Sequence, residues 1–230
     1  MRVVVPFAAE TPKTRLESVL TSAERSAVAR AMLADVLCAV VGAGHEPMVV
    51  STAPLDLETL ELPGEVLTSA SVTLDERSLT DAVNARLPGG EGETAADGID
   101  PVAVVMADLA LATPDALEAL LATSADVAIA PGRGGGTNAL VVRHPDFVVD
   151  YHGTSYLDHR EIALEVGATL ETVDSFRLAT DIDEPADLVE VLVHGREGAR
   201  APTCLREFGF ELADRDGRVD VSRDGDHGAA

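Results

Sequence analysis

Short apolar runs alternate with segments of helical periodicity along most of this chain. The strongest run, residues 101–106 (Pro-Val-Ala-Val-Val-Met), is almost continuously apolar, as expected of a strand buried on both faces. Similar runs lie at residues 2–6, 47–51, 126–130 and 138–143. Repeated strand and helix alternation predicts an α/β fold with a mostly parallel central sheet and helices on both faces. Such sheets bind ligands at the carboxyl ends of their strands, so the loops there are the candidate functional segments.

Capping and turn signals place the remaining elements. Thr21 and Glu24 form a capping-box pattern before a long apolar-periodic helix that ends near residues 42–44, and Thr113-Pro114 is typical of another helix start. Residues 88–100 are rich in glycine and acidic side chains and are expected to form a solvated loop. The other expected elements are strands at residues 64–68, 169–173 and 176–179, helices at 78–87, 155–166 and after Pro185, and a hairpin within 208–221. We expect one domain, with a core of about residues 1–195 and a C-terminal extension over 196–230.

Acidic side chains dominate the charge of the chain. There are 40 acidic and 17 basic residues, and the formal net charge of −23 would repel a phosphate backbone, so a nucleic-acid partner is excluded. The acidity is spread along the chain, and Lys13 is the only lysine. This pattern is typical of a protein from a salt-loving organism, whose salt screens self-repulsion. An ordinary acidic protein is the alternative.

The chain is expected to be soluble and cytoplasmic, without a membrane partner. No apolar run reaches the roughly 18 to 20 residues that span a bilayer. The apolar stretch at the N-terminus is too short for a secretion signal. Cys38 and Cys204 are the only cysteines, and Cys38 falls in a helical apolar pattern, where a buried reduced thiol is expected.

Two cations, Lys13 and Arg15, lie in the long loop after the first strand. A lysine point charge beside an arginine fork suits the oxygens of a triphosphate. The alternative is that both cations only neutralise nearby carboxylates. The segment is not a P-loop, because no glycine-rich run ends in Gly-Lys-Ser or Gly-Lys-Thr.

Three aspartates follow predicted strands and could meet at the same sheet edge. Asp108 comes directly after the strongest strand, and Asp181 and Asp183 would face the same way if their segment is extended. Converging carboxylates are suited to Mg²⁺, which prefers carboxylate and phosphate oxygens. Each aspartate also has a simpler explanation, since Asp108 could cap a turn and Asp183 could cap the helix near Pro185.

The glycine-rich segment 131–138 is a candidate anion site. Its three consecutive glycines allow close approach of the backbone to a ligand, and Thr137 adds a hydroxyl, although a plain surface turn is the alternative. Ser155 precedes a helix whose N-terminus could attract phosphate or could simply be capped by the serine. His159 is interpreted as a surface or packing residue and not as a general base. The chain has neither a Gly-x-Ser-x-Gly elbow nor a His-Glu-x-x-His zinc motif.

These residues, taken in order, resemble the 2-phospho-L-lactate guanylyltransferases. The resemblance covers roughly residues 1–195, and the ordered sum of its motifs is more specific than any one of them. The matching segments are Val5-Pro6, Lys13-Thr14-Arg15-Leu16, Glu24-Arg25, Met32, Asp35-Val36-Leu37, Ala107-Asp108-Leu109, Gly134-Gly135-Gly136-Thr137-Asn138-Ala139-Leu140, Ser155 with His159, and Asp181-Ile182-Asp183-Glu184-Pro185-Ala186-Asp187-Leu188.

The resemblance implies a nucleotidyltransferase fold of the glycosyltransferase-A type. The implied reaction joins GMP from GTP to (2S)-2-phospholactate, giving lactyl-2-diphospho-5′-guanosine and pyrophosphate, in biosynthesis of coenzyme F-420. Similar enzymes use phosphoenolpyruvate instead. By this analogy the nucleotide would be held by Lys13, Arg15 and Asp108, which are also the catalytic candidates, Mg²⁺ by Asp108, Asp181 and Asp183, and the phosphorylated acid by Gly136, Thr137, Gly153 and Ser155.

One position departs from the family pattern, and rival functions remain. His152 occupies the place where relatives usually carry glycine, which puts the role of Gly153 in doubt. The rivals are a nucleotide transfer to another acceptor on the same fold and a non-catalytic nucleotide-binding protein. The first usually shows a Gly-Gly-x-Ser-x-Arg-Met loop after the first strand, which this chain lacks. The family resemblance also suggests a homodimer.

Overall fold

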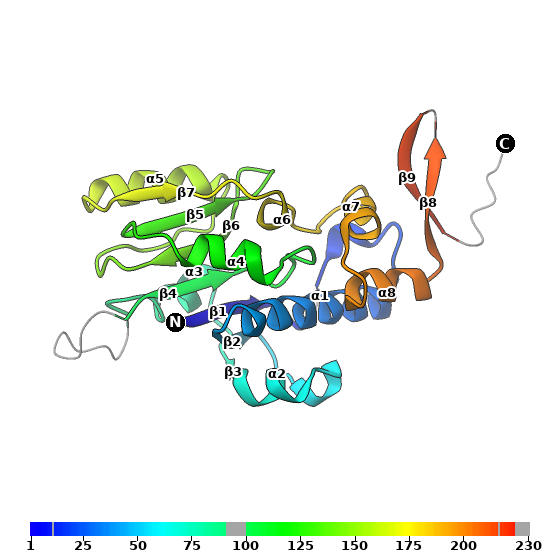
Figure 1. Cartoon of the computed structure of the whole chain (residues 1–230), viewed down its shortest axis with the longest axis horizontal. Coiled ribbons are helices and arrows are strands. Elements are labelled where there is room, and N and C mark those ends of the chain that lie inside the picture. Colours follow the sequence, from blue (N-terminus) through cyan, green and yellow to red (C-terminus); the bar gives the residue numbers. More distant parts are fainter. Residues whose placement is uncertain (11, 91–99, 216, 224–230) are drawn as a thin grey trace.

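The computed structural model describes residues 1–10, 12–90, 100–215 and 217–223. Its centre is a seven-stranded sheet with strand order β3-β2-β1-β4-β6-β5-β7 (Figure 1). Only β6 runs antiparallel to its neighbours, so the expectation of a mostly parallel sheet is confirmed. The strands are β1 (Arg2–Phe7), β2 (Glu46–Ser51), β3 (Ser71–Leu74), β4 (Val102–Val105), β5 (Val127–Pro131), β6 (Thr137–Val142) and β7 (Leu170–Thr172).

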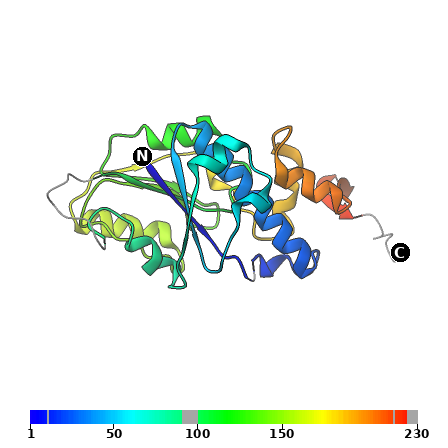
Figure 2. The ribbon, with the colours of Figure 1, turned by 90° about the horizontal axis from the view of Figure 1, so that it is seen from below.

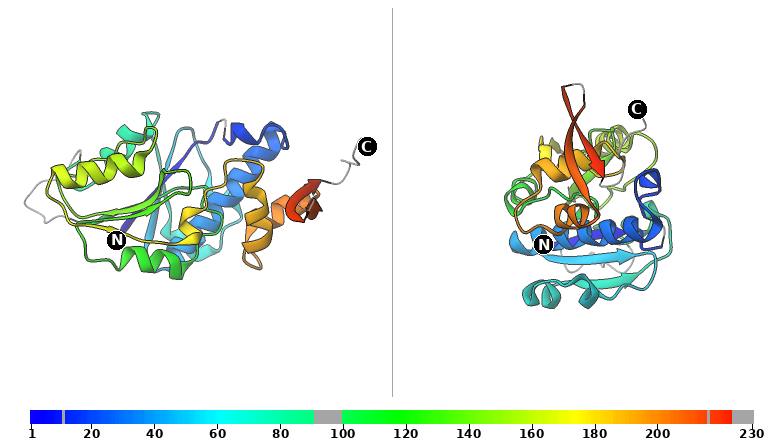
Figure 3. Two further views of the ribbon diagram at one scale, coloured as in Figure 1. Left: turned by 90° about the horizontal axis from the view of Figure 1, so that it is seen from above. Right: turned by 90° about the vertical axis from the view of Figure 1, so that its right-hand side faces the viewer.

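Helices cover both faces of the sheet (Figures 2 and 3). One face packs against α1, α2, α4 and α6, and the other against α3 and α5. The helices are α1 (Ser22–Gly42), α2 (Gly64–Ser69), α3 (Leu79–Asn84), α4 (Pro114–Leu121), α5 (Ser155–Glu165), α6 (Phe176–Ala179), α7 (Asp187–His194) and α8 (Arg200–Glu207), with short 3-10 turns η1 (Thr14–Leu16) and η2 (Leu57–Leu60). In the described part of the chain, no helix is long and apolar enough to cross a membrane.

The capping signals of the two best-defined helices are confirmed. The Thr21 hydroxyl accepts from the Glu24 N–H while the Glu24 carboxylate accepts from the Thr21 N–H, which is the reciprocal capping box at the start of α1. Thr113 caps α4 through the Ala116 N–H, with Pro114 at the first helical position. The hairpin is also confirmed as β8 (Phe210–Arg215) paired with β9 (Arg218–Arg223).

Two expected strands are helices instead. Residues 64–68 lie in α2, where Pro63 precedes the first turn and Glu65 places a negative charge at the helix N-terminus. Residues 176–179 form α6, because the Ser175 hydroxyl accepts from the Leu178 N–H and winds the segment into a turn. One edge of the sheet is formed by β3, which was not predicted from the sequence. Most of the expected loop at residues 88–100 lies outside the described residues.

A third apolar cluster joins the C-terminal segment to the rest of the protein. It packs α7, α8 and Phe210 against the N-terminal half of α1. The hairpin β8–β9 extends beyond this cluster, away from the sheet (Figure 1). The anchor of α8 is Asp35, a buried residue of α1 whose two carboxylate oxygens accept from the N–H groups of Arg200 and Ala201, both at 2.8 Å. A side chain distant in sequence therefore caps this helix.

Replacing Asp35 with alanine is expected to lower the free energy of unfolding by about 2 kcal/mol, because α8 loses its cap and two N–H groups lose their acceptors. Urea unfolding at constant high salt measures the change. The control is Glu207→Ala, an exposed acidic residue on the same helix, for which no change above about 0.5 kcal/mol is expected. Equal stability of the two variants would contradict the role of Asp35.

Candidate active site

A cleft of about 300 Å³ lies at the carboxyl edge of the sheet. Because β6 runs antiparallel to β4, the start of β6 meets the end of β4 at this edge, with the Met106 N–H donating to the Asn138 carbonyl. The cleft is lined by residues at or after the ends of β1, β2, β3 and β4, by parts of α1 and α3, and by one residue after α6: Pro6, Phe7, Ala8, Pro12, Lys13, Ala29, Met32, Val50, Thr52, Asp75, Arg77, Leu79, Ala82, Met106, Ala107, Asp108 and Asp183.

Lys13 holds the polar side of the cleft together. Its Nζ donates to Asp108 Oδ2 and to Asp183 Oδ1, both at 2.7 Å, and its side chain is only 10% exposed. The Lys13 backbone is left-handed, with φ of 55°, a conformation that is uncommon for a side chain of this type. Backbone strain of this kind costs on the order of 1–3 kcal/mol and is typically found at functional sites. The chain therefore fixes its only lysine between two carboxylates.

The charge of Lys13 is secured by these partners. Burial acts to lower its pKa, but Asp108 and Asp183 outweigh that effect, so the pKa of Lys13 is raised above its ordinary value. Burial raises the pKa of Asp108, while its pairing with Lys13 opposes the rise and the charge of Asp183 adds to it. The ammonium of Lys13 therefore does not fully offset the effects of burial and of the Asp183 charge on the pKa of Asp108.

The two carboxylate oxygens of Asp108 differ, because only Oδ2 pairs with Lys13. Its Oδ1 is buried and has no hydrogen-bond partner among the described residues. An unpaired buried carboxylate oxygen is costly unless a cation or a donor arrives with the ligand. Hard oxygen donors of this kind are what Mg²⁺ binds, so the residue fits the cation that the sequence analysis expected at this edge.

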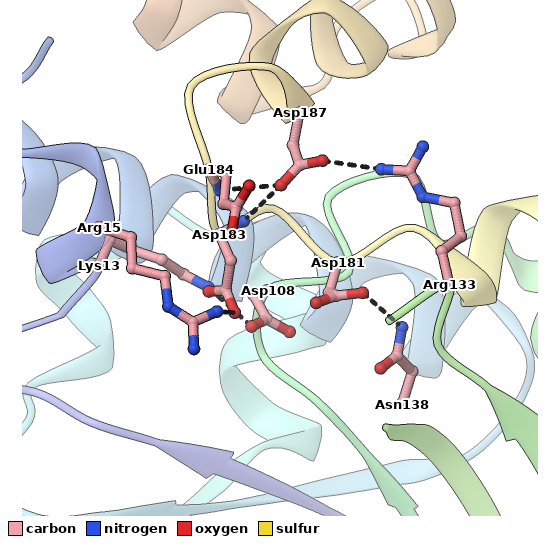
Figure 4. A network of polar contacts seen from close by, with 9 residues as sticks. All are labelled: Lys13, Arg15, Asp108, Arg133, Asn138, Asp181, Asp183, Glu184 and Asp187. Carbon is pink, nitrogen blue, oxygen red and sulfur yellow. Dashed lines mark hydrogen bonds and ion pairs between the residues drawn. The ribbon is translucent and has the colours of Figure 1, made fainter. Parts of the chain in front are cut away.

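The other two predicted aspartates lie beside Asp108 (Figure 4). The Asp183 carboxylate pairs with Lys13 and, at 3.4 Å, with Arg15. The Asp181 Oδ1 accepts from Asn138 Nδ2 at 3.0 Å. Within the described ranges, no three His, Cys, Asp or Glu side chains are grouped so that they could hold a metal ion.

The side chain of Arg15 is much more exposed than that of Lys13. The Arg15 side chain is 68% exposed, and its contact with Asp183 is long, at 3.4 Å. An exposed pair of this kind contributes little to stability, so turning the guanidinium toward an anion costs little.

Asn138, Asp187 and Arg133 form a frame that the sequence analysis did not identify. Asn138 holds Asp181 and also donates to the Leu178 carbonyl at 3.0 Å. Asp187 Oδ2 accepts from the backbone N–H of Asp183 at 3.1 Å and of Glu184, and its Oδ1 pairs with Arg133 at 2.7 Å (Figure 4). Asn138 and Asp187 belong to the segments that carry the family resemblance, which was the available signal.

The predicted acid-binding residues form a second, buried group. Thr137 and Ser155 are each 4% exposed, and the Thr137 N–H donates to Ser155 Oγ at 3.0 Å. Thr137 Oγ1 lies 2.8 Å from Nδ1 of His159, which is fully buried and therefore a packing residue with polar contacts and not a surface residue. Because Thr137 and Asn138 are consecutive in β6, their side chains point to opposite faces of the sheet. Thr137 and Ser155 have no described contact with Lys13, Asp108 and Asp183, which together form the lysine cluster.

Gly136 and Gly153 keep space open near this group. A Cβ at Gly153 would meet no atom within 4 Å, and its φ of 53° lies in the left-handed region that favours glycine. A Cβ at Gly136 would meet only Asn138 Oδ1, at 4.0 Å. The neighbouring His152 is exposed and in contact with Asp150, which raises the pKa of His152 through a hydrogen bond.

Relatives of known name match the chain over nearly its full length. The family model described as guanylyl transferase CofC like matches residues 1–224. A Haloterrigena turkmenica protein named 2-phospho-L-lactate guanylyltransferase is 73% identical over 224 residues and covers 97% of each chain. A protein of the same name from Natrialba magadii is 63% identical over 242 residues and covers 97% of this chain and 99% of its own.

Solved structures share the fold at low sequence identity. A Desulfovibrio desulfuricans protein described as a nucleotide-diphospho-sugar transferase superposes with a TM-score of 0.68 at 17% identity, over 90% of this chain and 94% of its own. A nucleotidyl transferase from Methanothermobacter superposes with a TM-score of 0.54 at 17% identity, over 90% of this chain and 98% of its own. These similarities confirm the expected type of fold. The family match and the identity to the two relatives show that the chain belongs to the CofC-like guanylyl transferase family.

Proposed function

We propose that this protein transfers GMP from GTP to (2S)-2-phospholactate, giving (2S)-lactyl-2-diphospho-5′-guanosine and pyrophosphate, in the biosynthesis of coenzyme F-420. The names of the two relatives support this acceptor. The observation that carries the proposal is the Lys13 ammonium, held 2.7 Å from both Asp108 and Asp183 on the lining of the cleft. It joins anion-binding and metal-binding groups in one place, which is what a metal-bound triphosphate requires.

The triphosphate would bind Lys13 and Arg15. Lys13 supplies a fixed, buried positive charge, and Arg15 supplies a mobile fork that can follow the phosphate oxygens. In a chain with a net charge of −23, an anion needs such local cations. Lys13 would exchange part of its contact with the two aspartates for contact with phosphate oxygens.

Asp108, Asp181 and Asp183 would hold the magnesium ion. When bound, the ion neutralises charge on the triphosphate and on the pyrophosphate that leaves. The chain supports this with the unpaired Oδ1 of Asp108 and with Asn138 and Asp187, which orient Asp181 and the backbone at Asp183. Such supporting contacts commonly decide how well metal ligands are positioned.

The reaction needs no residue that acts as a base. A phosphate oxygen of the acid attacks the α-phosphorus of GTP, one P–O bond forms, the bond to the β-phosphate oxygen breaks, and pyrophosphate leaves with the electron pair. The attacking phosphate is largely ionised at neutral pH, since its second pKa is about 6. Catalysis then depends on positioning and on neutralising charge. This accounts for the lack of a nucleophile motif in the sequence.

The acid would bind at the start of β6 and of α5. Thr137 and Ser155 offer hydroxyl groups, and Gly136 and Gly153 leave room for a ligand to approach the backbone. Phosphoenolpyruvate is the closest competing acceptor, because it is also a three-carbon phosphorylated carboxylate. We further propose that the enzyme works in a salt-rich cytoplasm, since 40 acidic residues against 17 basic ones need screening.

Pyrophosphate release tests the proposal. The protein is incubated at high salt with GTP and Mg²⁺, without an acid, with 2-phospholactate or with phosphoenolpyruvate, and with ATP or CTP in place of GTP. We expect release that requires both GTP and 2-phospholactate. Release with phosphoenolpyruvate alone would change the acceptor but keep the reaction. No release with either acid would overturn the assignment.

A further inference from the structure

His159 lies outside the cleft residues, yet its buried ring is held by polar contacts on both sides. The ring is carried by α5 and packs edge-on against Phe147 and Tyr151, with centroids 6.1 and 5.2 Å away. Nδ1 lies 2.8 Å from Thr137 Oγ1, and Nε2 lies 2.9 Å from the backbone nitrogen of Asp150. His159 is fully buried, with an exposed fraction of zero.

The two contacts determine where the ring proton is. The Asp150 N–H can only donate, so Nε2 must accept and cannot carry a proton. Burial lowers the pKa of His159 to about 4, against the opposing charges of Asp158 and Asp150, so the ring is neutral at physiological pH. The single ring proton therefore resides on Nδ1 and is donated to Thr137 Oγ1.

This arrangement leaves the proton of Thr137 for a ligand. The Thr137 oxygen accepts from His159, and no acceptor for its own proton is found among the described residues. Ser155 is in the same position, because its Oγ accepts from the Thr137 N–H and its own proton has no described acceptor. A threonine or serine hydroxyl can usually donate or accept. Here each oxygen already accepts one hydrogen bond and each hydroxyl proton lacks a described acceptor, which favours a ligand that accepts, such as an anion.

We propose that His159 is a positioning residue that fixes the Thr137 hydroxyl as a donor to the phosphorylated acid. The inference rests on the proposed function, because that function supplies the acid. His159 does not touch the ligand. It acts through the Thr137 oxygen, and the Asp150 N–H acts on it in turn by fixing which ring nitrogen carries the proton.

The main test compares His159→Phe with His159→Asn. Phenylalanine keeps the ring contacts to Phe147 and Tyr151 but removes the donor, and we expect KM for the acid to rise about tenfold, the loss of one hydrogen bond to a charged ligand. KM for GTP should stay within about twofold. Asparagine places an N–H near the position of Nδ1 and should restore most of the acid affinity. As a matched control, His194→Phe, at an exposed ring on α7, should change neither constant.

A double substitution shows whether His159 acts through Thr137. Thr137→Val removes the hydroxyl, and adding His159→Phe to it should raise KM for the acid no further. Additive effects, or equal changes in both KM values, would overturn the inference. If the phenylalanine variant fails to fold, imidazole nitrogen NMR of the unaltered protein decides the question without substrate. The inference requires a protonated Nδ1 and an unprotonated Nε2, and the opposite tautomer would refute it whether or not the proposed reaction occurs.

Discussion

Replacing Asp108 with asparagine is expected to lower kcat by about two to three orders of magnitude, the size of effect seen when one preorganised charge is lost from a reaction centre. The change keeps the shape of the side chain. It removes the negative charge that pairs with Lys13 at 2.7 Å and replaces one oxygen of a carboxylate whose buried Oδ1 has no partner among the described residues. The Mg²⁺ concentration needed for half-maximal rate should rise as well. Steady-state kinetics across a magnesium titration measure both effects.

The fold of the Asp108→Asn variant should be unaffected. Burial raises the pKa of Asp108, so a neutral side chain is tolerated there, and the unfolding midpoint should be equal to or above that of the unaltered protein. Asp115→Asn, an exposed aspartate at the start of α4, is the control and should leave kcat unchanged. A turnover within about threefold of the unaltered protein would remove Asp108 from the metal site.

Replacing Lys13 with alanine is expected to lower kcat/KM for GTP by about 100-fold, because the buried charge that we propose binds the triphosphate is lost. KM for the acid should change much less, since Thr137 and Ser155 have no described contact with the lysine cluster. Initial rates at varied GTP and fixed acid measure the effect. An unaltered GTP dependence would mean that Lys13 only balances Asp108 and Asp183.

Two further substitutions separate the charge of Lys13 from its backbone. Lys13→Arg keeps a positive charge but replaces a point charge with a planar fork, so it should recover part of the activity. Lys13→Gly removes the charge and relieves the left-handed backbone at φ 55°. The glycine variant should be as inactive as the alanine variant, and it should unfold at a higher urea concentration than the alanine variant. Recovery of activity with glycine would show that the strain, and not the ammonium, matters.

The sequence predicted the strands that position the site because their apolar runs are uninterrupted. β1, β4, β5 and β6 were found within one or two residues, and the order of polar loops after them placed Lys13 and Asp108 at one edge. It could not predict that Lys13 touches Asp108 and Asp183, which are 95 and 170 residues away in the chain. Such contacts depend on the order of strands in the sheet, which periodicity does not contain.

Supporting residues were harder to predict than the charged ones. Asn138, Asp187 and His159 work through contacts made by the fold, and each would read as an ordinary polar residue in its local segment. Asp35 is similar, because its partners on α8 are distant in the chain and α8 itself was missed. The short segments 64–68 and 176–179 were wrongly predicted as strands for a different reason. In α2 the Pro63 start and the acidic first turn at Glu65, and in α6 the Ser175 cap, outweighed the strand propensity of a few apolar residues.

The product formed from GTP and 2-phospholactate tests the central claim most directly. Phosphorus NMR of the reaction at high salt with Mg²⁺ resolves the new diphosphate linkage and free pyrophosphate. We expect one pyrophosphate for each guanosine joined to the acid through a diphosphate, and neither product when the acid is left out. Formation of GDP with inorganic phosphate, or of free GMP with pyrophosphate in the absence of acid, would contradict direct guanylyl transfer in this cleft.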